Sequence, residues 1–152
     1  MTYKLQTAAI AFLIFLSTLC GAQSLRETTD WMHNFAATES TWTDLDGDYH
    51  STTLVFAGCQ VTQMELINGK TWIGFSYSLT DIDPTSIRSS GVYFSTSNNV
   101  SRIETLFPQG TVVEEGGLYH GVVNFVIKED AVRFTRAFIH AILLCGGKPS
   151  TF

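Results

Sequence analysis

The chain has 152 residues and a formal net charge of −5, and only 15% of its residues are charged. An acidic balance argues against nucleic acids and anionic membrane surfaces as partners, because both attract clustered lysine and arginine. Hydrophobic residues make up 45% of the chain and aromatic residues 12%, which argues against disorder. The composition is typical of an exported domain rich in strands.

The first 22 residues have the pattern of a secretory signal peptide. Lys4 precedes an apolar run over residues 8–19, which is too short to span a bilayer and suits the core of a signal peptide. Small residues up to Ala22 predict cleavage after that residue. We therefore expect a secreted or periplasmic protein, with one domain over residues 23–152 and no transmembrane segment in the mature chain.

Two other fates of the leader stay open. Cys20 would be acylated in a lipoprotein, but Leu19 stands where a lipobox needs a small residue. The leader could also remain uncleaved as an anchor. The leader alone does not reveal the host, although we expect a bacterial one.

A short helix is predicted over residues 25–36. Ser24 and Glu27 form a capping-box pattern, in which each side chain can bond to the backbone amide of the other residue. Apolar side chains that include Trp31 and Phe35 follow at helical spacing. We expect them to dock the helix on a sheet, and an exposed aromatic recognition face is the alternative.

A hairpin is predicted around Asn68-Gly69, between strands over residues 61–67 and 70–79. Asn-Gly is typical of a type I′ turn, which needs a positive φ at both central positions. In unbroken register, a two-residue turn places Met64 opposite Ile73. Large apolar residues then alternate with small polar ones along the second strand, which predicts one buried face.

A second hairpin is predicted over residues 92–97 and 100–107, with Asn98-Asn99 at its tip. Asn99 also begins a glycosylation sequon, which matters only in a eukaryotic host. Residues 111–115 suit an edge strand that ends at the Gly116-Gly117 turn.

The last third of the chain is predicted to be a buried strand over residues 122–127 followed by a long amphipathic helix. Apolar residues from Ala131 to Cys145 recur every three or four positions and share a face. Carboxylates at 129 and 130 suit the start of this helix, where the helix dipole is positive. Gly146 or Gly147 supplies the left-handed residue that ends helices.

This order of elements predicts an α+β fold. We expect an antiparallel sheet of about six or seven strands, with a short N-terminal helix and a long C-terminal helix packed on it. The order is compatible with a pleckstrin-homology-like roll, in which the last helix caps a bent sheet. A plain sheet with both helices on one face is the alternative.

Cys59 and Cys145 are the cysteines that remain after removal of the leader. Two thiols in an oxidising compartment most simply pair, which predicts a disulfide. Two free buried thiols, or a metal-binding or catalytic thiol, are the alternatives. In unbroken register Cys59 falls on the small-residue face of its strand, so the pairing requires either a helix on that face or a bulge at Gly58.

No stretch of the sequence has the pattern of a catalytic or metal-binding motif, and we expect no cofactor. Asp44, Asp46 and Asp48 resemble the start of a calcium loop, but Tyr49 stands where that loop needs glycine. A hairpin tip at Asp46-Gly47 explains the same residues.

The residues that could serve a hydrolase are two carboxylates and two histidines. Asp81 or Asp83, combined with His120 or His140, could supply the acid and base of a small periplasmic hydrolase. Because Pro84 follows, the carboxylates are more simply turn residues. A surface or hydrogen-bonded histidine is likewise the plainer interpretation of His140, and none of the chain's four histidines has zinc-ligand spacing.

Three segments resemble a family of short exported bacterial proteins of unknown function. Residues 25–32, LRETTDWM, resemble their opening L-x-E-T-x-x-W-L, with Met32 where leucine is usual. Residues 79–84, LTDIDP, are similar to their L-x-D-L-D-P turn, and residues 137–148, AFIHAILLCGGK, to their closing segment. The resemblance implies a secreted bacterial domain and carries no known activity or catalytic residues.

We expect a non-enzymatic exported module that binds a protein, a peptide or an apolar small molecule. The expectation rests on the many aromatic residues, the absence of a catalytic motif and a frame joined by a disulfide. The periplasmic hydrolase is the second hypothesis, and a structural component of the envelope is the third.

Overall fold

The computed structural model describes residues 23–89, 92–97, 103–107, 110–111 and 120–149. The predicted signal peptide with its cleavage site, the Asn98-Asn99 tip with its sequon, and most of the predicted strand 111–115 lie outside these residues. The elements are α2 (Leu25–Glu39), β1 (Thr41–Thr43), β2 (Tyr49–Ala57), β3 (Gln60–Ile67), β4 (Lys70–Ser78), the 3-10 turn η1 (Leu79–Asp81), β5 (Arg88–Ser89), β6 (Val92–Ser95), β7 (Glu104–Phe107), β8 (Gly110–Thr111), β9 (His120–Val123) and α3 (Lys128–Leu144).

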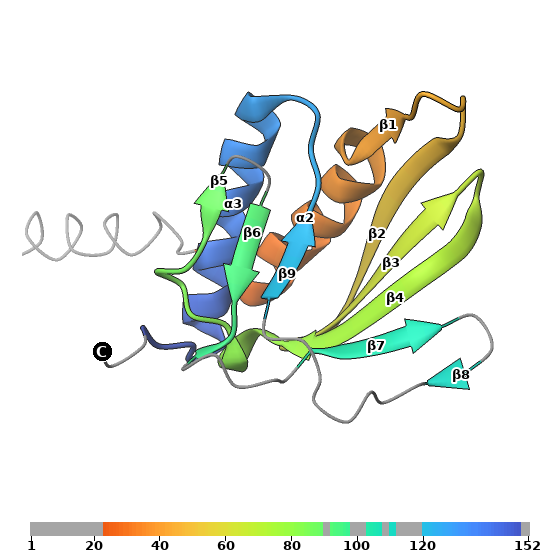
Figure 1. Cartoon of the computed structure of the whole chain (residues 1–152). Helices are drawn as coiled ribbons and strands as arrows, with labels where there is room; N and C mark the ends of the chain where they lie inside the picture. Colours follow the sequence, from red (N-terminus) through yellow and green to blue (C-terminus); the bar gives the residue numbers. More distant parts are fainter. Residues whose placement is uncertain (1–22, 90–91, 98–102, 108–109, 112–119, 150–152) are drawn as a thin grey trace, which may run out of the picture.

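The strands form two antiparallel sheets (Figure 1). The large sheet has the order β1-β2-β3-β4-β7-β8, and the small sheet has the order β5-β6-β9. The α+β class and the antiparallel pairing are confirmed. The prediction of one sheet with six or seven strands is wrong, because the described strands divide between two sheets.

The second predicted hairpin is also wrong. β6 pairs with β5 and β9 in the small sheet, whereas β7 pairs with β4 and β8 in the large sheet. The chain therefore crosses from one sheet to the other between β6 and β7. This crossing produces the division into two sheets.

The Asn68-Gly69 turn is confirmed, but its strands are not in unbroken register. Asn68 has a φ of 51° and Gly69 a φ of 75°, as the predicted turn requires. Beyond the turn, a register shift occurs between Glu65 and Leu66, so Met64 lies opposite Gly74 and not opposite Ile73. One extra residue in β4 shifts every later pair by one position, as in a β-bulge.

Cys59 lies in the turn between β2 and β3, and it forms a disulfide with Cys145. Their Cα atoms are 5.8 Å apart. Neither predicted route to this pairing was right, because Gly58, with a φ of 62°, is a turn residue and Cys59 is not in a strand. The bond joins one end of the large sheet to the C-terminal end of α3.

The N-terminal helix begins as predicted and is one turn longer than predicted. The capping box is formed, with the amide of Glu27 donating to Ser24 Oγ and the amide of Ser24 donating to the Glu27 carboxylate. Met32 is fully buried and Phe35 is nearly so, which confirms the docking role. α2 packs against β2 and against α3.

The closing helix is confirmed, and the strand before it is shorter than predicted. β9 ends at Val123, and Val126 and Ile127 are 69% and 53% exposed. The carbonyl of Ile127 accepts the first hydrogen bonds of α3, from the amides of Asp130 and Ala131. The chain must therefore leave the sheet before Ile127. At the other end, Gly146 supplies the left-handed residue, with a φ of 83°.

The core contains a row of aromatic rings that extends from the large sheet to α2. Ring centroids of successive members lie 4.4–5.9 Å apart, which is the usual distance for paired aromatic side chains. The members, in order, are Tyr77, Phe94, Phe138, Phe134, Phe125, Phe35 and Trp31. Both sheets and both helices therefore share one core.

Candidate functional site

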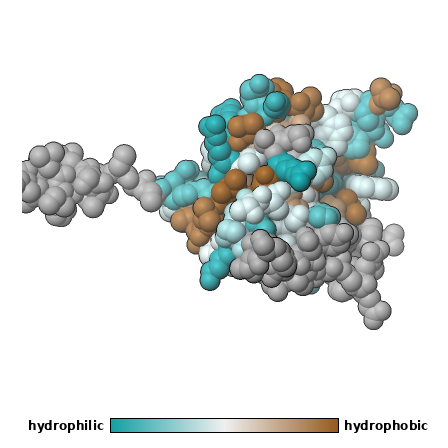
Figure 2. All heavy atoms as spheres, turned by 60° about the vertical axis from the view of Figure 1, so that its left-hand side comes forward, coloured by the Kyte–Doolittle hydropathy of each residue, from teal (hydrophilic) through white to brown (hydrophobic). Residues whose placement is uncertain are grey.

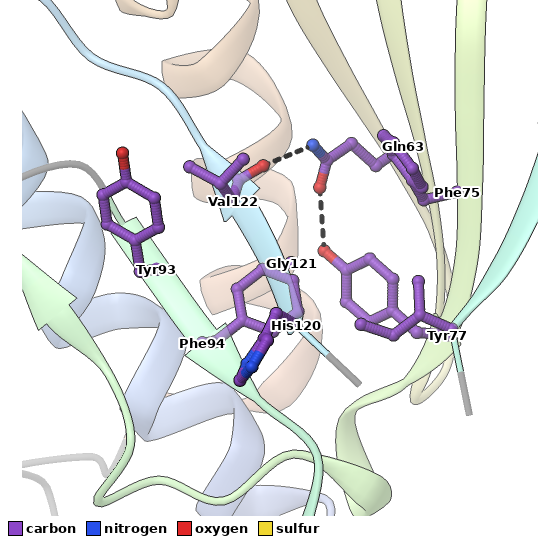
Figure 3. A pocket seen from close by; sticks show the side chains of 9 residues that line it. Gln63, Phe75, Tyr77, Tyr93, Phe94, His120, Gly121 and Val122 are labelled. Atoms are coloured by element: carbon purple, nitrogen blue, oxygen red, sulfur yellow. Dashed lines mark hydrogen bonds between the residues drawn. The ribbon is translucent and has the colours of Figure 1, made fainter. Parts of the chain in front are cut away.

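A cavity of about 260 Å³ lies between the two sheets (Figure 3). Its walls are mainly aromatic and aliphatic, and they come from β3, β4, β6 and β9 together with Ile103. The lining residues are Gln63, Phe75, Tyr77, Tyr93, Phe94, Ile103, His120, Gly121 and Val122. Because these residues belong to both sheets, the cavity depends on the packing of one sheet against the other.

Gly121 allows the ring of Phe94 to pack closely against the small sheet beside this cavity. Phe94 is buried, and it pairs with Gly121 on the neighbouring strand. A Cβ atom added at Gly121 would overlap the ring of Phe94. Glycine is therefore required here by a close approach, and the ring of Phe94 fills the space where a side chain would stand.

A polar network closes one side of the cavity. The hydroxyl of Tyr77 donates to Gln63 Oε1 at 3.2 Å, and Gln63 Nε2 donates to the carbonyl of Val122 at 2.7 Å (Figure 3). Burial raises the pKa of Tyr77, so its hydroxyl stays protonated and acts as a donor. These polar groups are bonded to one another and leave an otherwise apolar wall.

Glu65 extends this network behind the cavity. Gln63 Nε2 donates to Glu65 Oε1 at 2.9 Å, and Thr52 Oγ1 donates to Glu65 Oε2 at 3.0 Å. Burial raises the pKa of Glu65, although both hydrogen bonds act in the opposite direction. Glu65 does not line the cavity, so its role lies in holding Gln63 and Thr52.

A second, more polar cavity adjoins the first. It has a volume of about 500 Å³ and shares Tyr93, Phe94, His120 and Gly121 with the apolar cavity. Its other lining residues are Ser86, Arg88 and Ser95. An apolar compartment and a more polar one therefore adjoin, and four lining residues belong to both.

Ser95 and His120 form a hydrogen-bonded pair where the two cavities meet. The distance from Ser95 Oγ to His120 Nδ1 is 2.8 Å, and the two residues are direct neighbours on β6 and β9. A hydroxyl beside an imidazole is the beginning of a nucleophile–base arrangement. Ser95 lies within a strand, and not at a strand-to-helix turn of the kind that exposes a hydrolase nucleophile.

The other residues of the predicted hydrolase set have structural partners. Asp83 is buried and its Oδ1 accepts from the amide and the hydroxyl of Thr85, at 2.8 and 2.7 Å, as a turn residue does. His140 Nε2 lies 3.1 Å from the carbonyl of Gln23, on the surface of α3. Asp81 lies in η1. Of the four residues, His120 is the one that lines the cavity between the sheets.

The aspartates at the β1–β2 turn hold the turn itself. Asp44 Oδ1 accepts from the amides of Asp46 and Asp48, and Asp44 Oδ2 lies 2.9 Å from His50 Nε2. The hydrogen bond to His50 lowers the pKa of Asp44. The described residues contain no group of three or more histidine, cysteine or acidic side chains placed to hold a metal ion.

On the face shown in Figure 2, hydrophobic and hydrophilic residues are mixed over the part of the chain drawn in colour. Exposed apolar residues that are scattered singly are normal for a folded domain. Among the described helices, none has both the length and the apolar character needed to cross a bilayer.

The chain matches no protein-family model, no curated protein and no solved structure. The resemblance of its three segments to short exported bacterial proteins stays a prediction. The function must therefore be argued from the geometry of the cavity.

Proposed function

We propose that the protein is an exported bacterial module that binds a small apolar molecule in the cavity between its two sheets. The observation that carries this proposal is the cavity itself, which is apolar apart from a few fixed polar groups. Concave sites of this composition are the usual form of small-molecule sites in proteins. Export belongs to the proposal through the predicted leader, and bacterial origin belongs to it through the resemblance of three segments to short exported bacterial proteins.

The size of the cavity favours a small molecule over the other predicted partners. A volume of about 260 Å³ lies just below the range of roughly 300–1,000 Å³ that drug-sized ligands occupy. It is too small for more than one or two side chains of a protein or peptide. A single short apolar chain or ring suits it best.

The hydrogen bonds among the polar groups of this network favour ligand binding over catalysis. Tyr77 is protonated and bonded to Gln63, and Gln63 is bonded to Val122. Groups fixed in this way orient a ligand, but they supply neither a nucleophile nor a base. The predicted pleckstrin-homology-like roll gains no support from the two-sheet arrangement, and the proposal does not depend on it.

A neutral fluorescent probe, N-phenyl-1-naphthylamine, tests the proposal. We expect the wild type to bind it with one saturable site, because the probe is apolar and the cavity has apolar walls. Val122→Phe places a ring in the cavity and should weaken binding by at least about tenfold. The matched control is Val126→Phe, which adds the same ring at a position that is 69% exposed.

Two results would contradict the proposal. One is a wild type that binds no probe. The other is Val122→Phe protein that remains folded, as judged by urea denaturation, and binds the probe as tightly as Val126→Phe.

The Ser95–His120 contact favours a hydrolase of small apolar esters as the second candidate. In that case p-nitrophenyl butyrate would be turned over, and Ser95→Ala and His120→Gln would each abolish turnover while N-phenyl-1-naphthylamine still binds. His140→Gln is the control, since His140 lies on the surface of α3. A wild type without turnover eliminates this candidate.

A further inference from the structure

We infer that the molecule held in this cavity is amphipathic: an apolar chain that ends in a carboxylate, with the carboxylate bound by Arg88. The inference rests on the proposed function and adds the chemistry of the ligand. It comes from the second cavity, from the register of the small sheet and from the charges of the lining residues.

The two cavities adjoin and differ in the character of their walls. They share Tyr93, Phe94, His120 and Gly121, so a ligand of sufficient length in the apolar cavity would have its end close to the polar one. The polar cavity adds two serines and Arg88 to these shared walls. A ligand that is apolar along its whole length would leave the polar compartment unused.

The register of the small sheet places Arg88 at a suitable distance. Arg88 lies opposite Tyr93, and Tyr93 lies opposite Val122, so the three residues form one row across the strands. Direct neighbours across strands point to the same face of a sheet, and neighbouring strands are about 4.8 Å apart. The backbones of Val122 and Arg88 are therefore about 10 Å apart, which is a separation that an arginine side chain and a short ligand can bridge.

The charged residues that line the two cavities are complementary to an anion. Arg88 is exposed, and its guanidinium is a permanent cation whose planar shape suits the two oxygens of a carboxylate. Neither cavity has an aspartate or a glutamate among the described residues that line it. Ser86 and Ser95 line the same compartment as uncharged polar residues.

An apolar chain with an anionic end occurs both as a free fatty acid and as an anionic lipid in a bilayer. The chain's net charge of −5 disfavours approach to an anionic bilayer. The cavity volume of about 260 Å³ suits one short chain better than the two chains of a lipid. We therefore assign the ligand to the free carboxylates.

Isothermal titration with octanoate and with 1-octanol at pH 7.5 tests the inference. Octanoate is ionised at this pH, because carboxylic acids have pKa values of about 4–5. Arg88→Met keeps the length of the side chain and removes its charge. We expect it to weaken octanoate binding about tenfold and to change octanol binding less than about twofold.

The control is Arg26→Met, which removes an exposed arginine of α2 that lines neither cavity and should leave both affinities unchanged. Equal effects of Arg88→Met on octanoate and octanol would overturn the inference and leave the proposed function standing. Wild-type protein that binds neither compound would overturn both. Protein that sediments with phosphatidylglycerol vesicles but does not bind octanoate would assign the site to a lipid and overturn the choice of a free carboxylate.

Discussion

The side-chain amide of Gln63 donates a hydrogen bond of 2.7 Å to the main-chain carbonyl of Val122, and this bond joins the large sheet to the small one beside the cavity. The two residues are 59 positions apart in the chain. Gln63 is 1% exposed, and its side-chain amide also donates to the Glu65 carboxylate and accepts from the Tyr77 hydroxyl. One polar side chain therefore helps to set how the sheets meet.

Gln63→Leu should lower the free energy of unfolding by about 2–3 kcal/mol, because the carbonyl of Val122 and the hydroxyl of Tyr77 lose a buried partner. Urea denaturation measures this difference. Gln60→Leu, at an exposed position of the same strand, should change stability by less than about 0.5 kcal/mol. Equal effects of the two substitutions would mean that the bond between the sheets adds nothing to stability.

Glu65→Gln should remove a pH dependence of stability. The pKa of Glu65 is raised above the ordinary value of 4.5, so the folded protein binds this proton more tightly than the unfolded chain does. The resulting stabilisation is complete below the unfolded pKa and is lost as the pH rises through the folded pKa. Relative to Glu65→Gln, the wild type should therefore become less stable as the pH rises from about 4 to about 7.

Urea denaturation of both proteins across this pH range measures the difference, and the other carboxylates cancel in the comparison. A difference that stays constant with pH would show that the pKa of Glu65 is the same in the folded and unfolded states. A wild type that becomes more stable, relative to Glu65→Gln, as the pH rises would show that folding lowers the pKa of Glu65.

Phe138→Ala should destabilise the protein by about 3–5 kcal/mol. Phe138 is fully buried, and its ring lies 5.1 Å from that of Phe94 and 5.9 Å from that of Phe134, so the substitution leaves a void between α3 and the small sheet. Thermal or chemical denaturation measures the loss. The control is Leu143→Ala on the same helix, which should have a much smaller effect because this side chain is 55% exposed. Equal losses of stability in the two variants would show that Phe138 is not part of the core.

Replacing both Cys59 and Cys145 with serine should cost about 4–5 kcal/mol, because the disulfide closes a loop with a sequence separation of 86 and restricts the unfolded chain. The measurement is urea denaturation with and without a reductant. Reductant should shift the wild type to the stability of the double variant and leave that variant unchanged. A wild type that is indifferent to reductant would show that the bond does not stabilise the fold.

Features fixed by a few adjacent residues were predicted from the sequence. The capping box at Ser24, the turn at Asn68-Gly69 and the helix end at Gly146 are all present. Each follows from backbone geometry that the local residue types favour. The disulfide was also predicted, since it needs only two cysteines and an oxidising compartment.

The division into two sheets was not predicted, because it depends on pairing between distant segments. Val92 pairs with Val123, although a hairpin with the strand that follows β6 was the simpler expectation. The shifted register of β4 was missed for a similar reason, since the extra residue near Trp72 leaves no mark in the alternation of apolar residues.

The candidate site was predicted only at His120. Gln63, Arg88 and Ser95 belong to no motif, and they converge only through the meeting of the two sheets and the pairing within the small sheet. One signal was present: Gln63 stands two positions after Val61, on the face of its strand that is buried, and a polar residue at such a position usually has a specific partner.

The most direct test of a ligand cavity between the sheets is a ¹H–¹⁵N NMR titration of the oxidised protein with 1-octanol. The account predicts saturable shifts of the Tyr93, Gly121 and Val122 amides and of the side-chain amide of Gln63. Leu45 and Trp72, which are exposed and lie outside the cavity, should change little. Shifts confined to Leu45 and Trp72, or shifts that never saturate, would contradict it.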